Sequence, residues 1–380
     1  MAEKLWYKRY YEDQAAELLQ PGKVTVMYGP RRSGKTELIK RIIGNFEGRI
    51  YSGKGDDMDL QSVFAMRSQS RFSALFSQYD LLFLDEAQYL PEVGAGLKLL
   101  VDSFPAMAII VSGSSSFQLS GKLGEPLTGR QRIRILFPIS AMELHMQFGG
   151  MELISKKDEL LIFGSYPETL QYNSFKEKQE YLLSLRNAYL FKDILQFDDI
   201  KYSLKISDLL KMLAFQIGHG VSVNELANAL AISRQTVERY LDLLEKTFII
   251  KRVTGFSRNL RSEITKTVRY YFWDNGIRNA LINNFNLPGS RNDIGMLWEN
   301  FLFIERIKKQ EYQRIFSNNY FWRTYTRQEI DLIEEREGKL AGYEFKWGPK
   351  KSKPPRLWLD TYPEASFETI NGENFLEFIT

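Results

Sequence analysis

Apolar and polar positions along the first 150 residues form a repeated pattern of short buried segments and amphipathic ones. Helical spacing lies between most of the apolar runs, as in 36–43, which stops at Gly44. This alternation is typical of a parallel sheet wrapped by helices, so an α/β fold class is predicted. Five runs predict the strands of this sheet: 24–28, 49–51, 80–85, 108–112 and 133–137.

The pattern changes twice further along the chain. From about residue 156 to 218 the spacing is helical, and residues 221–273 read as a helix–turn–helix followed by strands. Beyond the turn at 287–292 the chain is again mixed α/β. Three domains are therefore predicted: an α/β core at 1–150, a helical and winged-helix segment at 151–286, and a further α/β domain at 287–380.

Composition limits the chemistry. With 380 residues the chain is long enough for two or three domains. It has no cysteine and only two histidines, His145 and His219, which excludes disulfides, thiolate nucleophiles and cysteine-based zinc sites. Any catalysis must therefore use carboxylates, lysine, arginine and a metal. The formal net charge of +4 permits contact with nucleic acid but does not argue for it.

Targeting signals are not visible in the sequence. Charges interrupt the apolar residues at the N-terminus, and no run of about 18 apolar residues is present. We expect a cytoplasmic protein without a membrane partner.

The strongest motif lies between the first strand and the first helix. It fits G-x-x-x-x-G-K-[ST], in which glycines let backbone amides point at phosphate oxygens and the helix N-terminus adds its positive dipole end. We expect Lys35 to contact the β- and γ-phosphates of ATP and Thr36 to bind Mg²⁺. The predicted nucleotide-binding residues of this loop are Gly29, Pro30, Arg31, Arg32, Ser33, Gly34, Lys35 and Thr36.

Acidic residues follow the third predicted strand. Asp85 is placed to hold Mg²⁺, directly or through water, and Glu86 to orient or activate the attacking water. Ser114, after the fourth strand, is a candidate sensor of the γ-phosphate, although serines are also common in ordinary turns.

An arginine that stabilises the transferred phosphate is expected near residue 130. Arg130 is the candidate, acting within its own chain or from a neighbouring subunit, and Arg132 and Arg134 are close enough to compete for the role.

The helix–turn–helix has its own signals. Ser222 and Glu225 predict a capping box on the first helix, and Ser233 a cap on the second. In a DNA-binding protein, the exposed side chains Arg234, Gln235 and Arg239 would face the major groove. The alternative is a helical module packed on the ATPase core, which the nearby Glu238 and the small net charge favour.

The C-terminal segment contains acids and a lysine in a nuclease-like order. Glu299 lies on a predicted helix, Asp331 on a strand, and Glu344 with Lys346 on one face of the next strand. Converging carboxylates would bind Mg²⁺ while the lysine positions water. The alternative is a strand pair with solvated acids.

Taken together, these motifs resemble the archaeal and bacterial AAA-type ATPases that carry a winged helix and a C-terminal restriction-endonuclease-like, PD-(D/E)XK-type domain. The resemblance implies ATP binding and hydrolysis and a relation to regulatory switches whose nucleotide state alters domain arrangement. The motifs that carry it are 29–36, 84–88, 112–115, 129–130 with 137–140, 163–168, 298–300, 329–331 and 344–346.

Two functional hypotheses remain from the sequence. In the first, the protein is an ATP-gated nuclease acting on DNA or RNA. In the second, it is an ATP-driven switch that binds a protein or nucleic-acid partner, and the nuclease-like tail is catalytically silent. Self-association is compatible with both, and the oligomeric state is not predicted.

Overall fold

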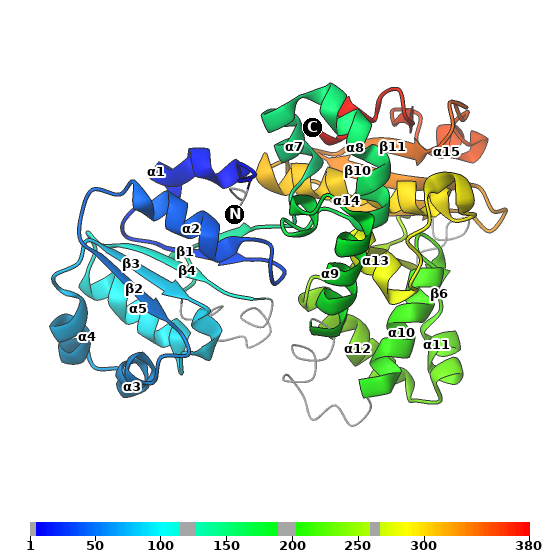
Figure 1. Ribbon diagram of the computed structural model, residues 1–380. Coiled ribbons are helices and arrows are strands. Elements are labelled where there is room, and N and C mark those ends of the chain that lie inside the picture. The colour runs from blue at the N-terminus through cyan, green and yellow to red at the C-terminus, as the bar shows by residue number, and fades with distance from the viewer. Residues whose placement is uncertain (1–4, 115–126, 189–202, 259–266) are drawn as a thin grey trace. The chain divides into compact units, whose positions relative to one another are not determined.

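A computed structural model describes residues 5–114, 127–188, 203–258 and 267–380. The chain divides into two compact units, which are described separately below (Figure 1). The first unit comprises Lys8–Pro138 with Lys246–Phe248. The second comprises Met1–Tyr7, Ile139–Glu245 and Ile249–Thr380.

The first unit is built on a five-stranded parallel sheet in the order β2-β3-β4-β1-β5. Val26 lies opposite Val111 on one side and Ile133 on the other, so β1 is interior. Every residue of β1 and β4 is buried, as expected for strands covered on both faces. The predicted α/β fold is confirmed, with strands β1 (Val24–Tyr28), β2 (Ile50–Lys54), β3 (Leu81–Asp85), β4 (Ala108–Ser112) and β5 (Gln131–Ile135).

Helices cover the two faces of this sheet. Figure 1 shows α2 on one side of the strands and α5 on the other, as right-handed crossovers require when the strand order reverses. Leu38, Ile39, Ile42 and Ile43 form the buried stripe of α2. The helices of this unit are α1 (Ala15–Leu18), α2 (Lys35–Gly44), α3 (Met58–Met66), α4 (Gln69–Phe76) and α5 (Val93–Ser103).

The second unit begins with helices. Ser140 and Glu143 form a reciprocal capping box at the start of α7, and α13 packs against α8 and α9. The long helix α14 carries the predicted Glu299 and has a largely buried middle portion. The helices are α7 (Ala141–Phe148), α8 (Gly150–Phe163), α9 (Phe175–Ala188), α10 (Ser203–Phe215), α13 (Asn275–Leu281) and α14 (Ile294–Tyr312).

The predicted helix–turn–helix is formed by α11 (Val223–Leu230) and α12 (Arg234–Lys246). The Ser222 hydroxyl accepts from the amide of Glu225 at 3.3 Å, and the Ser233 hydroxyl accepts from the amide of Thr236 at 3.1 Å. A three-stranded antiparallel sheet follows in the order β6-β8-β7, with β6 (Gly220–Val221), β7 (Ile250–Thr254) and β8 (Val268–Phe272).

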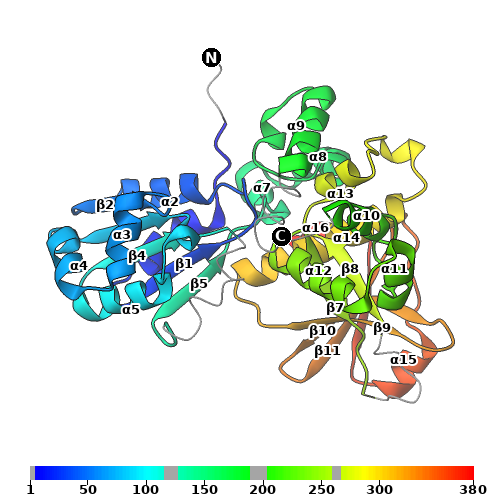
Figure 2. The same ribbon diagram turned by 90° about the horizontal axis from the view of Figure 1, so that it is seen from below.

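A second sheet ends the unit, in the order β12-β11-β10-β9. Figures 1 and 2 show α15 beside its strands, where Trp358 packs on Trp322 with ring centroids 5.4 Å apart. Gly255, just after β7, bridges to Phe321 of β9, which joins the two sheets. The elements are β9 (Asn318–Arg323), β10 (Glu329–Arg336), β11 (Lys339–Phe345), α15 (Arg356–Thr361), β12 (Ser366–Ile370) and α16 (Phe375–Ile379).

The helical, helix–turn–helix and C-terminal segments thus share one compact unit, and the division into three domains stays a prediction. In the described part of the chain, no helix has the length and apolar character needed to cross a membrane.

Candidate functional site

The loop after β1 has a backbone that only glycine permits. Gly29 has φ of +144°, and a Cβ there would lie 2.0 Å from the carbonyl oxygen of Leu136. Gly34, which immediately precedes α2, is left-handed with φ of +95°. The loop therefore turns tightly at the end of β1 and leads directly into the N-terminus of α2. Helix N-termini of this kind bind phosphate.

Polar groups inside this loop fit an anionic ligand. Lys35 is 6% exposed, and its Nζ donates to the carbonyl oxygens of Gly29 at 2.9 Å and Pro30 at 2.8 Å. The Ser33 hydroxyl is buried and has no hydrogen-bond partner among the residues that the structure describes. A buried hydroxyl without a partner is costly unless a ligand satisfies it, so the loop is suited to phosphate oxygens.

The predicted magnesium residues meet at the end of the sheet. The Thr36 hydroxyl lies 3.1 Å and 3.0 Å from the two carboxylate oxygens of Asp85. The Ser112 hydroxyl also donates to Asp85, from the end of the neighbouring strand β4. These hydroxyl and carboxylate oxygens are the hard ligands that Mg²⁺ prefers, so the residues present fit the ion.

Glu86 is held in an unusual conformation beside this pair. Its φ of +51° is left-handed, which costs energy for a residue with a side chain and is frequent at functional sites. Its amide donates to the Ser112 hydroxyl at 3.1 Å. The Gln88 side-chain amide donates both to the Glu86 carboxylate and, at 3.2 Å, to the Ser114 hydroxyl. Gln88 therefore links Ser114 to Glu86, and the role of Ser114 as a γ-phosphate sensor stays a prediction.

Three further residues of this site were not predicted. Ser112 and Gln88 lie inside motifs quoted for the resemblance, but their spacing alone gave them no role. Arg9 is 2% exposed and donates to the carbonyls of Ser33 and Phe137, both at 2.6 Å. Because 24 and 128 residues separate these partners from Arg9, no local pattern could have indicated the contact.

Arg130 is not brought to the loop within one chain. Its carbonyl accepts from the amide of Val24, the first residue of β1. The loop follows the last residue of β1, at the opposite end of the strand. Five residues of strand separate the two ends by about 16 Å. The Arg130 guanidinium pairs with Asp102 at 3.0 Å. The intrachain role predicted for Arg130 is therefore not supported, and its action from a neighbouring subunit stays a prediction.

The competing arginines are occupied as well. Arg132 and Arg134, both on β5, form ion pairs with Glu17, which precedes β1. Neither residue is available to the loop in this arrangement.

The outer face of α12 is exposed, as predicted. Arg234, Gln235 and Arg239 point to solvent, while Val237 and Tyr240 are buried. Arg234 pairs with Glu238 at 2.9 Å, so part of the positive charge on this face is already neutralised. An acidic side chain on a recognition face repels DNA phosphates, and this weakens the case for DNA binding.

The C-terminal acids come together, but around an arginine. Arg269 on β8 is 3% exposed, and its Nη1 lies 3.5 Å from Glu299 on α14 and 3.5 Å from Asp331 on β10. Its Nη2 lies 3.0 Å from Glu329. The β10–β9 register shifts between Ile330 and Ile333, so Asp331 sits at a bulge, a common way to redirect a side chain.

Burial governs the protonation of these acids. Burial, and after it the charge of Asp331, raises the pKa of Glu299 to about 8. The pKa of Glu344 is raised to about 7 by burial and then by Asp331. The pKa of Asp331 is also raised, mainly by burial. Lys346 donates to Glu344 at 2.7 Å, so the four predicted nuclease residues form one charged cluster.

This cluster is not arranged as a metal centre. Within residues 5–114, 127–188, 203–258 and 267–380, no group of three acidic or histidine side chains has the arrangement that holds a metal ion. The predicted magnesium site at Glu299, Asp331 and Glu344 therefore has no support from the structure.

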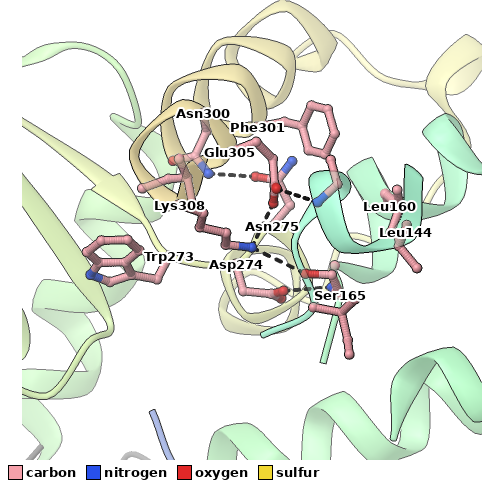
Figure 3. A pocket seen from close by; sticks show the side chains of 14 residues that line it. Leu144, Leu160, Ser165, Trp273, Asp274, Asn275, Asn300, Phe301, Glu305 and Lys308 are labelled. Carbon is pink, nitrogen blue, oxygen red and sulfur yellow. Dashed lines mark hydrogen bonds and ion pairs between the residues drawn. The ribbon is translucent and has the colours of Figure 1, made fainter. Parts of the chain in front are cut away.

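A small cavity lies elsewhere in the second unit, beside the 163–168 motif (Figure 3). Glu305 pairs with Lys308 at 2.7 Å and accepts from the Ala141 amide at 2.6 Å, while Asp274 accepts from the Ser165 amide at 2.8 Å. The cavity volume of about 20 Å³ suits a single water molecule and excludes a nucleotide. The side chains of Glu305 and Asp274 therefore have a structural role, because their hydrogen bonds hold α7, α14 and the 163–168 motif together.

Comparison with known families agrees with the first site. Residues 21–145 match the family model described as "AAA domain". Residues 155–287 and 294–360 match two domains of unknown function, DUF8612 and DUF4143. The first unit thus contains an AAA-type P-loop ATPase domain, the class that the loop and its acids define.

The relatives that match most of the chain are named as uncharacterised proteins. The chain is 27% identical over 343 residues to an uncharacterised protein of Mycobacterium tuberculosis, covering 88% of this chain and 73% of that protein. It is 25% identical over 403 residues to an uncharacterised protein of Methanocaldococcus jannaschii, covering 95% and 88%.

Solved structures give a distant likeness. The walker-type ATPase PABY2304 of Pyrococcus abyssi aligns with a TM-score of 0.48 at 17% identity, over 73% of this chain and 96% of that one. The RuvB Holliday junction branch migration motor of Thermotoga maritima aligns with a TM-score of 0.32 at 19% identity, over 64% and 88%.

Proposed function

We propose that the protein binds and hydrolyses ATP with Mg²⁺ and uses the nucleotide state to switch the arrangement of its second unit. The observation that carries the proposal is the pairing of Thr36 with Asp85 at 3.0 Å, beside a loop whose buried Ser33 hydroxyl has no partner in the described part of the chain. The AAA domain match over residues 21–145 supports it.

Each residue has a defined task in this proposal. The amides of the loop that ends at Gly34 and the Lys35 ammonium hold the β- and γ-phosphates, which requires Lys35 to leave the two loop carbonyls. Bound Mg²⁺, held by Thr36 and Asp85, would neutralise charge on the phosphates. Glu86, oriented by Gln88, accepts a proton from the attacking water.

A direct connection between loop and chain exit supports the switch. Arg9 holds the Ser33 carbonyl in the loop and the Phe137 carbonyl, one residue before the first unit ends at Pro138. Phosphate binding that shifts Ser33 therefore acts, through one buried guanidinium, on the segment that leads out of the unit.

The partner is proposed to engage the second unit, through its winged helix. The helix pair α11 and α12 followed by the β6-β8-β7 sheet supports that architecture. The mixed charges of the α12 face favour a protein partner over DNA. ATP-gated cleavage of nucleic acid, the other hypothesis, has no metal centre to support it among the described residues. Self-association and cytoplasmic location stay predictions.

The experiment compares the wild type with Glu86→Gln. The variant keeps the loop and the Thr36–Asp85 pair, so it should bind ATP normally while hydrolysis falls by about 100-fold or more, because the water loses its base. Binding is measured with a fluorescent ATP analogue, and turnover by phosphate release.

The control is Glu37→Gln, an exposed acid on α2 that pairs with Lys40. Its turnover should stay within twofold of the wild type. Full turnover in Glu86→Gln would remove Glu86 from the mechanism, and failure of the wild type to bind ATP with Mg²⁺ would overturn the whole proposal.

A further inference from the structure

Three carboxylates in the second unit share one buried guanidinium. Arg269 extends from β8 and lies 3.5 Å from Glu299, 3.5 Å from Asp331 and 3.0 Å from Glu329. These acids come from a helix and a strand of the four-stranded sheet, so a single side chain joins three elements.

We propose that Arg269 is the built-in cation of this acidic cluster and occupies the place that a divalent metal ion would take in a nuclease. The cluster then stabilises the fold and has no metal chemistry. The inference concerns the second unit alone and does not depend on ATP hydrolysis by the first.

Each acid already has a protein donor to one of its oxygens, although among the described residues the second, buried oxygen of Glu344 has no hydrogen-bond partner. Glu299 accepts from the Tyr271 hydroxyl at 2.8 Å, Asp331 from the Phe345 amide at 2.9 Å, and Glu344 from Lys346 at 2.7 Å. Mg²⁺ requires six oxygens in near-octahedral geometry at about 2.1 Å and keeps several of its waters. Binding a metal here would therefore break contacts that now satisfy buried charges.

Backbone closes one side of the cluster. Gly218 has φ of +75°, and a Cβ at this position would lie 2.8 Å from a carboxylate oxygen of Glu299. The loop before β6 thus lies directly against the acid, and this leaves little space there for a hydrated ion. On another side, the Arg269 guanidinium lies 4.6 Å from the ring centre of Phe321, which fixes its position through a cation–π contact.

An arginine suits this role better than a lysine would. Its planar guanidinium can serve several carboxylates at once, and it stays charged at every pH at which the protein folds. The cluster therefore carries its own counter-charge whatever the metal concentration around it.

The experiment uses Mn²⁺ as the probe and tryptophan fluorescence as the readout of thermal unfolding. All six tryptophans, residues 6, 273, 298, 322, 347 and 358, belong to the second unit, so metal binding at the P-loop does not contribute directly. A ligand that binds the folded form raises its melting temperature.

In the wild type, millimolar Mn²⁺ should leave the tryptophan transition unchanged. In Arg269→Gln, the freed acids should bind Mn²⁺, and the transition should rise by several degrees, on the order of 5 °C at a hundredfold excess over Kd. The matched control is Arg323→Gln, which removes an arginine that lies 4.0 Å from the outer acid Glu329. It should gain no Mn²⁺ response.

Two results would overturn the inference. One is a wild-type transition that rises with Mn²⁺ and loses this response in Asp331→Asn, because the metal would then bind beside Arg269. The other is an Arg269→Gln protein that folds and shows no response. If that variant lacks a transition, Arg269→Gln with Glu299→Gln removes one positive and one negative charge together. It should gain a smaller response, whose absence would count equally against the inference.

Discussion

The two charged sites of this protein use the same residue types in opposite ways. At the P-loop, Lys35 donates to neutral loop carbonyls, and the buried Ser33 hydroxyl has no partner within the described segments. At the C-terminal cluster, Arg269 and Lys346 pair directly with the carboxylates. The first site leaves its cation on neutral carbonyls, whereas the second pairs its cations with acids of the same chain, although one buried oxygen of Glu344 has no partner among the described residues. A set of acids beside a basic residue thus indicates ligand binding only when the protein does not supply the counter-charge itself.

Removing the cation from each site should have opposite consequences, and the largest effect is expected at the P-loop. Lys35→Ala removes the charge opposite the β- and γ-phosphates, so turnover should fall at least about 100-fold with a parallel loss of affinity for ATP. Loss of Arg269 should instead create affinity for a metal. Phosphate release and nucleotide titration measure the first effect.

The control for this variant is Lys40→Ala on the same helix, whose exposed ammonium pairs with Glu37. It should leave both quantities unchanged. Normal ATP affinity and turnover in Lys35→Ala would show that Lys35 does not bind the phosphates, and the two sites would then no longer differ in the way described above.

The metal requirement should distinguish the sites next. Asp85→Asn weakens the Mg²⁺ ligand set, so the Mg²⁺ concentration for half-maximal ATP hydrolysis should rise by about tenfold. Asp331→Asn should leave that concentration unchanged, because Asp331 faces Arg269. Mg²⁺ titrations of ATPase rate measure both. An equal change in the two variants would show that the C-terminal cluster takes part in the metal requirement.

The smallest effect concerns pH and the second unit. The pKa of Glu299 is about 8 in the folded protein, above the ordinary value of 4.5, so between these values the folded form holds a proton that the unfolded form releases. The contribution of Glu299 to the free energy of unfolding is therefore fully present below about pH 4.5, and it is lost as the pH rises through about 8. The tryptophan transition should fall between pH 6 and pH 9.

Glu299→Gln mimics the protonated acid and should show a smaller fall over the same range. The control, Glu335→Gln, changes a partly exposed acid that pairs with Arg258 and should fall as the wild type does. Identical pH dependence in wild type and Glu299→Gln would show that Glu299 does not titrate in this range.

The sequence by itself determined the parallel α/β core and the ATP loop. Strand periodicity predicted β1, β3 and β4, and eight adjacent residues carry the loop, because its cradle is made of local backbone amides. It also predicted the helix pair α11 and α12 from capping serines one turn from their targets. Such signals are local, so they survive without knowledge of the tertiary fold.

Only the tertiary structure decided the rest. The sheet order put Arg130 at the amino end of β1, away from the loop. The tertiary fold also brought Arg9 into contact with the loop at the Ser33 carbonyl. Packing of β8 against α14, together with the position of β10, brought Arg269 among acids that lie 30 to 62 residues further along the chain. Whether an acid meets a metal or an arginine depends on which distant side chain shares its low-dielectric surroundings, and residue spacing carries no information about that.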